Sequence, residues 1–219
     1  MPAQEASIIL VKDINTSAAS STPQNLTNVN GTLYFVASDS SGGSELWKSD
    51  GTEAGTVRVK DIYTGTASSN PQNLTNVNGT LYFSATDSSG GTELWKSDGT
   101  EAGTVRVKDI ASGTEASKPQ NLMNVNGTLY FVASDNSGGF ELWKSDGTQA
   151  GTVRVKDINA GTGSSTPQNL TNVNGTLYFV ATDSSGGSEL WKSDGTQAGT
   201  VRVKDINAGT GSSTPQNLT

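Results

Sequence analysis

The 219-residue sequence contains neither cysteine nor histidine, and these two absences restrict its chemistry severely. Without cysteine, the chain has no disulfide framework, no thiolate metal site and no cysteine nucleophile. Without histidine, it lacks the usual general base and the commonest ligand of transition metals. No organic cofactor is expected, and calcium, which binds to oxygen ligands, is the one metal considered below.

The sequence also lacks a concentration of positive charge and long apolar runs. The net charge is −7, and the 14 Lys and Arg residues are dispersed, so the basic stripe of a nucleic-acid-binding surface is missing. No apolar run approaches the roughly 18 residues of a membrane span. Residues 1–7 carry neither a positive n-region nor an apolar h-region, so no signal peptide is predicted. We therefore expect neither nucleic acid nor a membrane span.

One unit of 48 residues fills almost the whole chain. A fixed period in the range of about 20–50 residues is typical of repeat architectures, in which each unit packs against its neighbours. The string ELWKSDGT recurs around Trp47, Trp95, Trp143 and Trp191, in step with Pro23, Pro71, Pro119, Pro167 and Pro215. The predicted organisation is a leader with a surplus strand at 1–14, repeats at 15–62, 63–110, 111–158 and 159–206, and the start of a fifth repeat at 207–219.

Each unit is predicted to form four antiparallel strands. Asn-Gly between two apolar-alternating runs is a strong hairpin signal, because a type I′ turn needs positive φ at both central residues. In the second unit, with turns at Asn78-Gly79, 87–91 and Asp98-Gly99, the predicted strands are 73–77, 80–85, 93–96 and 104–110. The linker that follows is too long for a hairpin and suits a crossing to the next sheet.

Four strands with tight turns and a long crossing indicate an all-β fold, a β-propeller-type array of four-stranded antiparallel blades. The alternative is a β-solenoid, which the hairpin turns disfavour because they cannot join long parallel strands. Both faces of residues 33–37 are apolar, as expected for sheets covered on both sides. The predicted core consists of Leu33, Phe35, Leu46, Trp47, Val57 and Val59, with their equivalents in the other units.

The strings SGGSELWKSDGTEAGTVRVKDI and PQNLTNVNGTLYF resemble the ELWxxDGT-type tandem repeats of large secreted bacterial and archaeal proteins. The resemblance covers residues 8–219. It implies an extracellular, repeat-built surface protein, and it supplies no catalytic or ligand-binding residues.

Two sets of side chains in the ELWKSDGT string are candidates for sugar chemistry. The four tryptophans could stack on sugar rings, although filling the space between blades is the favoured interpretation. Pairs of carboxylates can hydrolyse glycosides, but four equivalent carboxylates favour a structural or binding role, and we expect no enzyme. The candidate ligand-binding residues are Trp47, Trp95, Trp143 and Trp191, and the carboxylates are Glu45, Glu93, Glu141 and Glu189.

Oxygen-rich turns and sequons complete the candidate sites. An Asp at the head of each Asp-x-Ser-Gly-Gly turn could bind calcium or bond to its own turn; these residues are Asp39, Asp87, Asp135 and Asp183. The aspartates of Ser-Asp-Gly-Thr are expected to form turns. Asn-x-Ser/Thr sequons, which could carry glycans or serve in hairpins, occur at Asn15, Asn25, Asn30, Asn73, Asn78, Asn126, Asn169, Asn174 and Asn217.

Departures from the repeat are few and scattered, and we expect them to build no shared site: Tyr63, Ser84, Lys118, Met123, Phe140, Gln149 and Gln197. Phe140 is predicted to be an exposed residue at a loop edge. The sequence thus favours a non-catalytic extracellular module that binds or adheres, with glycans as candidate ligands, through repeated weak sites.

The alternative function is that of a structural subunit. The chain holds five copies of the Val-Lys-Asp-Ile strand but only four complete sets of the other strands. A surplus strand can pair with another molecule. We therefore expect a homo-oligomer, either a head-to-tail filament or a larger ring, joined by exchange of terminal strands.

Overall fold

The structure is a computed structural model that describes residues 8–218. It contains four antiparallel sheets of four strands each, and each sheet follows the chain order. The strands are β1 (Gln24–Val29), β2 (Thr32–Ser38), β3 (Ser44–Ser49), β4 (Val57–Lys60), β5 (Gln72–Val77), β6 (Thr80–Thr86), β7 (Thr92–Ser97), β8 (Val105–Lys108), β9 (Gln120–Val125), β10 (Thr128–Ser134), β11 (Phe140–Ser145), β12 (Val153–Lys156), β13 (Gln168–Val173), β14 (Thr176–Thr182), β15 (Ser188–Ser193) and β16 (Val201–Lys204). The all-β prediction is confirmed, and the antiparallel order excludes the solenoid.

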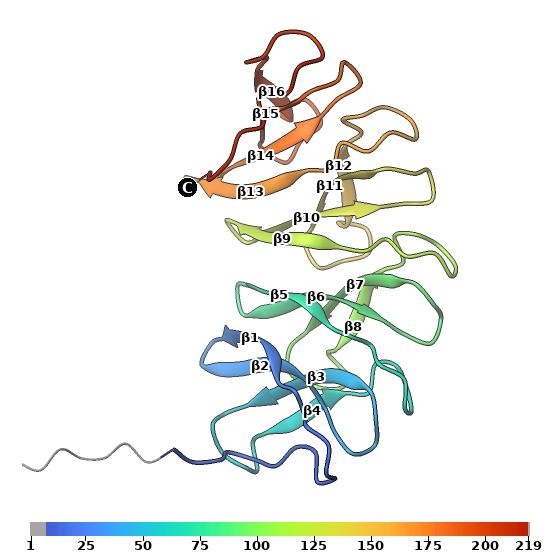
Figure 1. Cartoon of the computed structure of the whole chain (residues 1–219), viewed down its shortest axis with the longest axis vertical. Helices are drawn as coiled ribbons and strands as arrows, with labels where there is room; N and C mark the ends of the chain where they lie inside the picture. Colours follow the sequence, from blue (N-terminus) through green and yellow to red (C-terminus); the bar gives the residue numbers. More distant parts are fainter. Residues whose placement is uncertain (1–7, 219) are drawn as a thin grey trace, which may run out of the picture.

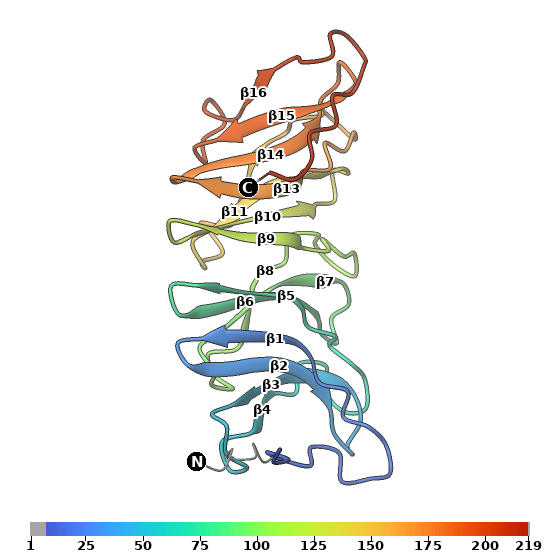
Figure 2. The ribbon, with the colours of Figure 1, turned by 60° about the vertical axis from the view of Figure 1, so that its left-hand side comes forward.

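The four sheets, which we call blades 1 to 4, stack along the long axis of the molecule in chain order (Figures 1 and 2). The first strands of successive blades, β1, β5, β9 and β13, lie side by side. Blades 1 and 4 occupy opposite ends, so the stack is open rather than closed into a ring. Within the part of the chain that the structure describes, no helix is long and apolar enough to cross a membrane.

The hairpins form where the Asn-Gly pairs predict them. Asn30 and Gly31 both have positive φ, 51° and 87°, and they join β1 to β2 where Val29 pairs with Thr32. The same turn recurs in each blade. The first strand also carries a bulge, because its register shifts between Gln24 and Thr27, and Asn25 within the bulge has a φ of 56°. A bulge of this kind turns side chains away from the regular alternation of a strand.

The hydrophobic core lies between the blades. Leu46, Val59 and Ile62 of blade 1 pack against Phe83 and Trp95 of blade 2, and equivalent clusters join blades 2 and 3 and blades 3 and 4. Equivalent side chains of this layer recur every 48 residues along the chain. The repeat therefore has a direct cause, because every blade must fit the face of the blade before it.

The predicted core is correct except at Leu33, at Val57 and its equivalents, and at two positions of blade 4. In that blade Leu190 is half-buried and Val203 is 46% exposed. Leu33 is half-buried, whereas its equivalents in the other blades are fully buried. Val57 is 36% exposed, and its equivalents are similar, so its assignment to the core is wrong. Val57 begins the short outermost strand opposite Lys48, beyond the area that the next blade covers. Two residues later, the side chain of Val59 is buried again.

The prediction of a surplus strand at residues 8–14 is wrong. This segment forms no strand in the structure. In every blade, the equivalent segment pairs with the Glu-Leu-Trp strand before it, and residues 8–218 hold no such strand ahead of Ile14. The other residues of the predicted leader, 1–7, lie outside the described residues. Units 15–62, 63–110, 111–158 and 159–206 each contain one complete blade.

Candidate functional site

The glutamate of the Glu-Leu-Trp string holds the linker between two blades. Glu45 is 1% exposed, and its carboxylate accepts hydrogen bonds from the Ile62 N–H at 2.9 Å, the Ser69 N–H at 2.9 Å and the Ser69 hydroxyl at 2.6 Å. Burial raises the pKa of Glu45, although these hydrogen bonds act in the opposite direction. Glu93 and Glu141 have the same kinds of partner and the same direction of pKa shift. These carboxylates are thus committed to the backbone and are not free for acid–base chemistry.

Glu189 differs from the other three in its pKa. It is as little exposed as the others and keeps hydrogen bonds from Ile206 and Ser213, but here the bond from the Ser213 hydroxyl, which lowers the pKa, outweighs desolvation, which raises it. Its partners are only partly buried, because blade 4 has no further blade against it among the described residues. The contrast shows that the desolvation of the inner glutamates depends on the neighbouring blade.

The lysine and glycine of ELWKSDGT connect successive blades. The Lys48 ammonium donates to the Gly99 carbonyl at 2.8 Å, and Lys96 donates to Gly147 at 2.9 Å. Gly99 has a φ of 89°, and a Cβ there would collide with the hydroxyl of Tyr34 in the preceding blade. Glycine is required at this position both for its backbone conformation and for the close approach of tyrosine.

The remaining residues of the string form the turn, as predicted for the Ser-Asp-Gly-Thr aspartates. Asp50 accepts hydrogen bonds from the Thr52 N–H at 2.9 Å and the Thr52 hydroxyl at 2.7 Å. The Ser49 and Thr56 hydroxyls lie 2.7 Å apart at the base of the loop. Aspartate that bonds to its own turn two residues on is the usual role of this residue type in loops.

The four tryptophans are buried, Trp47 beneath the segment that contains Ile14 and the other three between blades, which corrects their assignment as sugar-stacking platforms. Trp47, Trp95, Trp143 and Trp191 are only 5–6% exposed. Trp143 and Trp191 also donate their indole N–H groups to the carbonyls of Ala133 and Ala181, each at 3.1 Å. A ring enclosed in this way presents no face to a ligand, so the core interpretation is confirmed.

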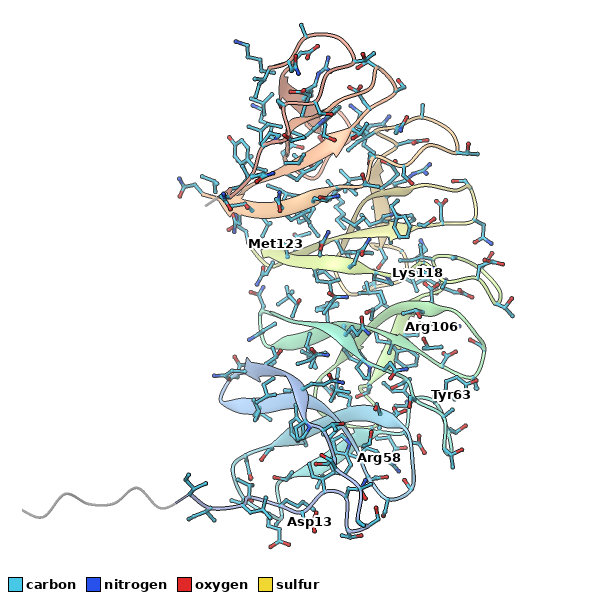
Figure 3. All side chains as sticks on the ribbon, in the orientation of Figure 1. Asp13, Arg58, Tyr63, Arg106, Lys118 and Met123 are labelled. Atoms are coloured by element: carbon cyan, nitrogen blue, oxygen red, sulfur yellow. The ribbon has the colours of Figure 1, made fainter. Side chains whose placement is uncertain are left out.

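The structure does not support calcium binding at the four candidate aspartates, because each one is paired with an arginine: Asp39, Asp87, Asp135 and Asp183. Asp39 accepts hydrogen bonds from Ser41 through one oxygen, and its other oxygen lies 3.4 Å from the Arg58 guanidinium. Arg106 occupies the equivalent place in blade 2 (Figure 3). Among residues 8–218, no group of three or more acidic side chains gathers as a metal site. A guanidinium beside each candidate would repel a cation.

The sequons fall into three classes. Asn15 is 6% exposed and bonds to Ser17, so its assignment as a glycan site is wrong. The hairpin sequons are exposed and remain predictions: Asn30, Asn78, Asn126 and Asn174. The third class lines the pockets beside the first strands, with Asn25, Asn73 and Asn169 in the first-strand bulges and Asn217 at the equivalent position of the terminal segment. Asn25 and Asn73 donate their side-chain N–H groups to proline carbonyls of the next unit, which disfavours a glycan there. Thr219, the last residue of the Asn217 sequon, is outside the described residues.

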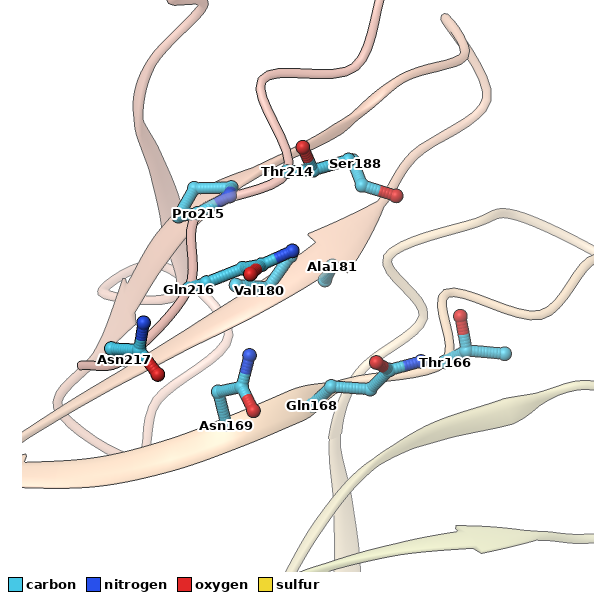
Figure 4. A pocket seen from close by; sticks show the side chains of 10 residues that line it. All are labelled: Thr166, Gln168, Asn169, Val180, Ala181, Ser188, Thr214, Pro215, Gln216 and Asn217. Carbon is cyan, nitrogen blue, oxygen red and sulfur yellow. The ribbon is translucent and has the colours of Figure 1, made fainter.

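A row of four equivalent pockets was missed by the sequence analysis. Each pocket is lined by the Gln-Asn pair of one unit and the Pro-Gln-Asn of the next, beside the first strands, and the volumes are about 270 to 370 Å³. Figure 4 shows the last pocket, where Gln168 and Asn169 of β13 lie across from Gln216 and Asn217. The Pro-Gln-Asn sequence, present five times, was the available signal.

The backbone is strained at the rim of every pocket. The residue before each of the five Pro-Gln-Asn prolines has positive φ: Thr22 (42°), Asn70 (45°), Lys118 (48°), Thr166 (42°) and Thr214 (42°). Positive φ is rare for threonine and costs about 1–3 kcal/mol. The Asn70 N–H donates to the Ser44 carbonyl at 3.1 Å, and Lys118 and Thr166 make the same bond in their blades. The fold holds these residues in place despite the strain.

Two of the seven repeat departures share a pocket, contrary to the prediction. Ser84 and Lys118 both line the pocket between blades 2 and 3, with Lys118 on the linker before β9 (Figure 3). Phe140 lines the pocket between blades 3 and 4. It is half-buried and packs on the core of these blades, so its assignment as an exposed residue is wrong. Three of the seven departures thus line these pockets.

Neither a family model nor a curated protein matches the sequence. Among solved structures, two of puromycin hydrolase are similar, with TM-scores of 0.53 and 0.50 and identities of 16% and 17%. In both, the match covers 84% of this chain and 29% of the hydrolase, so the chain spans less than a third of that protein. Bacteroides ovatus Xyloglucan PUL GH43B matches with a TM-score of 0.40 and 17% identity, over 86% of this chain and 41% of that one. At these identities, the likeness concerns the fold: the chain is a propeller-type array of four-stranded blades.

Proposed function

We propose that this chain is a non-catalytic binding module that holds a neutral carbohydrate along the row of amide-lined pockets. The observation that carries the proposal is the fourfold recurrence of one pocket, with primary amides on both sides. An amide side chain offers two donors and an acceptor, which suits neighbouring hydroxyl groups on a sugar.

The chemistry of the lining favours a neutral ligand and binding without catalysis. Within the described chain, the residues that line these four pockets include no carboxylate, and Lys118 is their single cation. Glycoside hydrolysis commonly requires a pair of carboxylates at the bond that is cleaved. The carboxylates of Glu45 and its equivalents are buried elsewhere and accept backbone hydrogen bonds.

Repetition explains how shallow pockets achieve useful affinity. Adjacent pockets share a Gln-Asn pair, so a polymer bound in one pocket reaches the next without leaving the surface. Linked sites of this kind raise apparent affinity by about 10²–10⁴-fold without any new contact. We therefore expect a polysaccharide to bind far more tightly than its monosaccharide unit. An extracellular location, as the resemblance to secreted repeat proteins implies, is part of this proposal.

A glycan array with the purified chain tests the proposal, followed by calorimetry on the retained glycan. Gln72, Gln120 and Gln168 are exposed in the pockets, and their successive replacement by alanine should weaken polymer binding stepwise. Gln149→Ala is the matched control, because Gln149 is an exposed amide on the turn after β11. An array that retains no glycan, or equal losses in the Gln149 variant, would refute the proposal.

A further inference from the structure

The two sides of every blade are complementary to each other. We call the side that meets the next blade the forward face and the side that meets the preceding blade the rear face. In blade 1, the forward face presents Val29, Tyr34, Leu46, Val59 and Ile62. In blade 2, the rear face presents Leu74, Leu81, Phe83, Ala85 and Trp95. The chain forms this same interface three times.

The forward face of blade 4 is uncovered in the structure. Val173, Val203 and Ile206 are 40%, 46% and 58% exposed, whereas their equivalents in the other blades are 5–7% exposed. These three side chains belong to a surface whose shape and chemistry are already matched to a rear face.

The rear face of blade 1 is occupied by residues 8–14 of the chain itself. Ile14 packs against Phe35 and Trp47, as Ile62 does against their equivalents in blade 2. The Lys12 ammonium donates to the Thr56 carbonyl at 2.9 Å. The bonds from Lys60 to Thr104, Lys108 to Thr152 and Lys156 to Thr200 are the same, at 2.9, 2.7 and 2.8 Å. The segment thus takes the place of the last strand of a preceding blade.

This cover is incomplete. Ile8, Ile9 and Leu10 are 101%, 77% and 77% exposed, and Leu26 on the rear face is 62% exposed. A mainly apolar cavity of about 400 Å³ remains between the segment and the blade, lined in part by Leu10, Leu26 and Phe35. A complete blade in place of residues 8–14 would cover Leu26 and fill this cavity, as blade 1 covers the equivalent Leu74 of blade 2.

We propose that a second copy of this chain docks the forward face of its blade 4 on the rear face of blade 1. Val203, Lys204 and Ile206 of the second copy replace Val11, Lys12 and Ile14, which have the same residue types in the same order. Residues 8–14 therefore compete with self-association, and releasing them strengthens it.

The other partial repeat undergoes the matching exchange. Residues 207–218 lie where the first strand of a following blade would begin: the Thr171 hydroxyl donates to the Leu218 carbonyl at 3.3 Å, as Thr27 donates to Leu74 at 3.4 Å. In the assembly, residues 15–26 of the docked blade 1 take this place. The contact is heterologous, so repeated addition produces a filament unless the rotation closes a ring.

Sedimentation velocity over a range of concentrations tests the proposal on the full chain. We expect Ile206→Asp to weaken association at least about tenfold, because it would bury an unpaired carboxylate in an apolar interface. Val201→Asp is the matched control, since the equivalent Val57, Val105 and Val153 stay 36–37% exposed even where blades pack. Equal association of these two variants would overturn the proposal.

A second pair of variants tests the competing segment. Ile14→Asp should release residues 8–14 and tighten association, whereas Ile8→Asp, at a fully exposed position, should leave it unchanged. Circular dichroism checks that each variant keeps its β structure. A wild-type chain and a folded Ile14→Asp variant that both remain monomeric at the highest concentration would contradict the idea. If Ile14→Asp does not fold, the comparison of Ile206→Asp with Val201→Asp decides.

Discussion

Replacing Glu93 with glutamine tests whether the buried glutamates are structural. One Glu93 oxygen accepts from the Ser117 N–H at 3.0 Å, and the other accepts from the Ile110 N–H at 2.9 Å and the Ser117 hydroxyl at 2.7 Å. Glutamine has the same shape but only one acceptor oxygen. Whichever way its amide is oriented, its NH₂ group faces a backbone N–H that loses its partner.

The expected cost follows from that orphaned donor. A buried N–H group without a partner costs about 1–3 kcal/mol of unfolding free energy. For a chain of this size, each kcal/mol corresponds to a fall of roughly 2–4 °C in melting temperature. Differential scanning calorimetry measures this fall. Glu101→Gln is the control, because Glu101 is exposed and the third and fourth units already carry glutamine, Gln149 and Gln197, at its position. Equal melting temperatures for the two variants would show that the glutamate does not hold the linker.

The same glutamates predict a dependence of stability on pH. Burial raises the pKa of Glu45, Glu93 and Glu141, so the folded state binds more protons than the unfolded state between the two pKa values. Their contribution is complete below the unfolded pKa and is lost as the pH rises through the folded pKa. Glu189 acts in the opposite direction, because its pKa is lowered. Glu93→Gln removes one of three equivalent groups. It should therefore reduce their share of the fall in unfolding free energy, as the pH rises through the folded pKa, by roughly a third.

Three further changes test the packing and the turns. Trp95→Ala should lower the unfolding free energy by about 3–5 kcal/mol, measured by urea denaturation, since it empties the layer between blades 1 and 2; an unchanged midpoint would contradict the core assignment. Gly99→Ala should destabilise more than Gly51→Ala, because both glycines have φ near 90° but only at Gly99 does a Cβ meet Tyr34; equal losses would mean that the interblade contact is unimportant. Asp87→Asn should cost less than about 1 kcal/mol, because the ion pair of Asp87 with Arg106 is partly exposed to solvent, and added calcium should not shift the melting temperature; a calcium-dependent rise would support a metal site at Asp87.

The fold was predictable because its signals are local. Asn78-Gly79 specifies a hairpin by backbone conformation alone, and the apolar residues on both faces of the run around Phe83 identify a strand covered on both sides. The period of 48 residues then implies that blades pack on one another. Each of these inferences needs only residues that are close in the sequence or repeated along it.

The pockets were not predictable in the same way, because they depend on how the linker crosses between blades. Asn73 meets the Pro119 carbonyl, 46 residues later, only through that crossing. Ser84 and Lys118 are 34 positions apart in the sequence and occupy different positions of the repeat, so they looked unrelated although they line one pocket. The role of Glu93 was hidden for a similar reason, because its partner Ser117 lies in the linker, 24 residues on.

The identical interfaces between blades also determine how the molecule comes apart. Each blade is coupled to its neighbours by the same nearest-neighbour energy, so the two inner blades gain it twice and the terminal blades only once. Local unfolding should therefore begin at the ends of the stack and spread inward. Blade 4, in which Ile206 is exposed, should unfold first. Amide protons of β14 should exchange faster than those of β6 and β10, although the three strands have nearly the same sequence. We therefore expect local stability to follow a strand's position along the stack more closely than its composition.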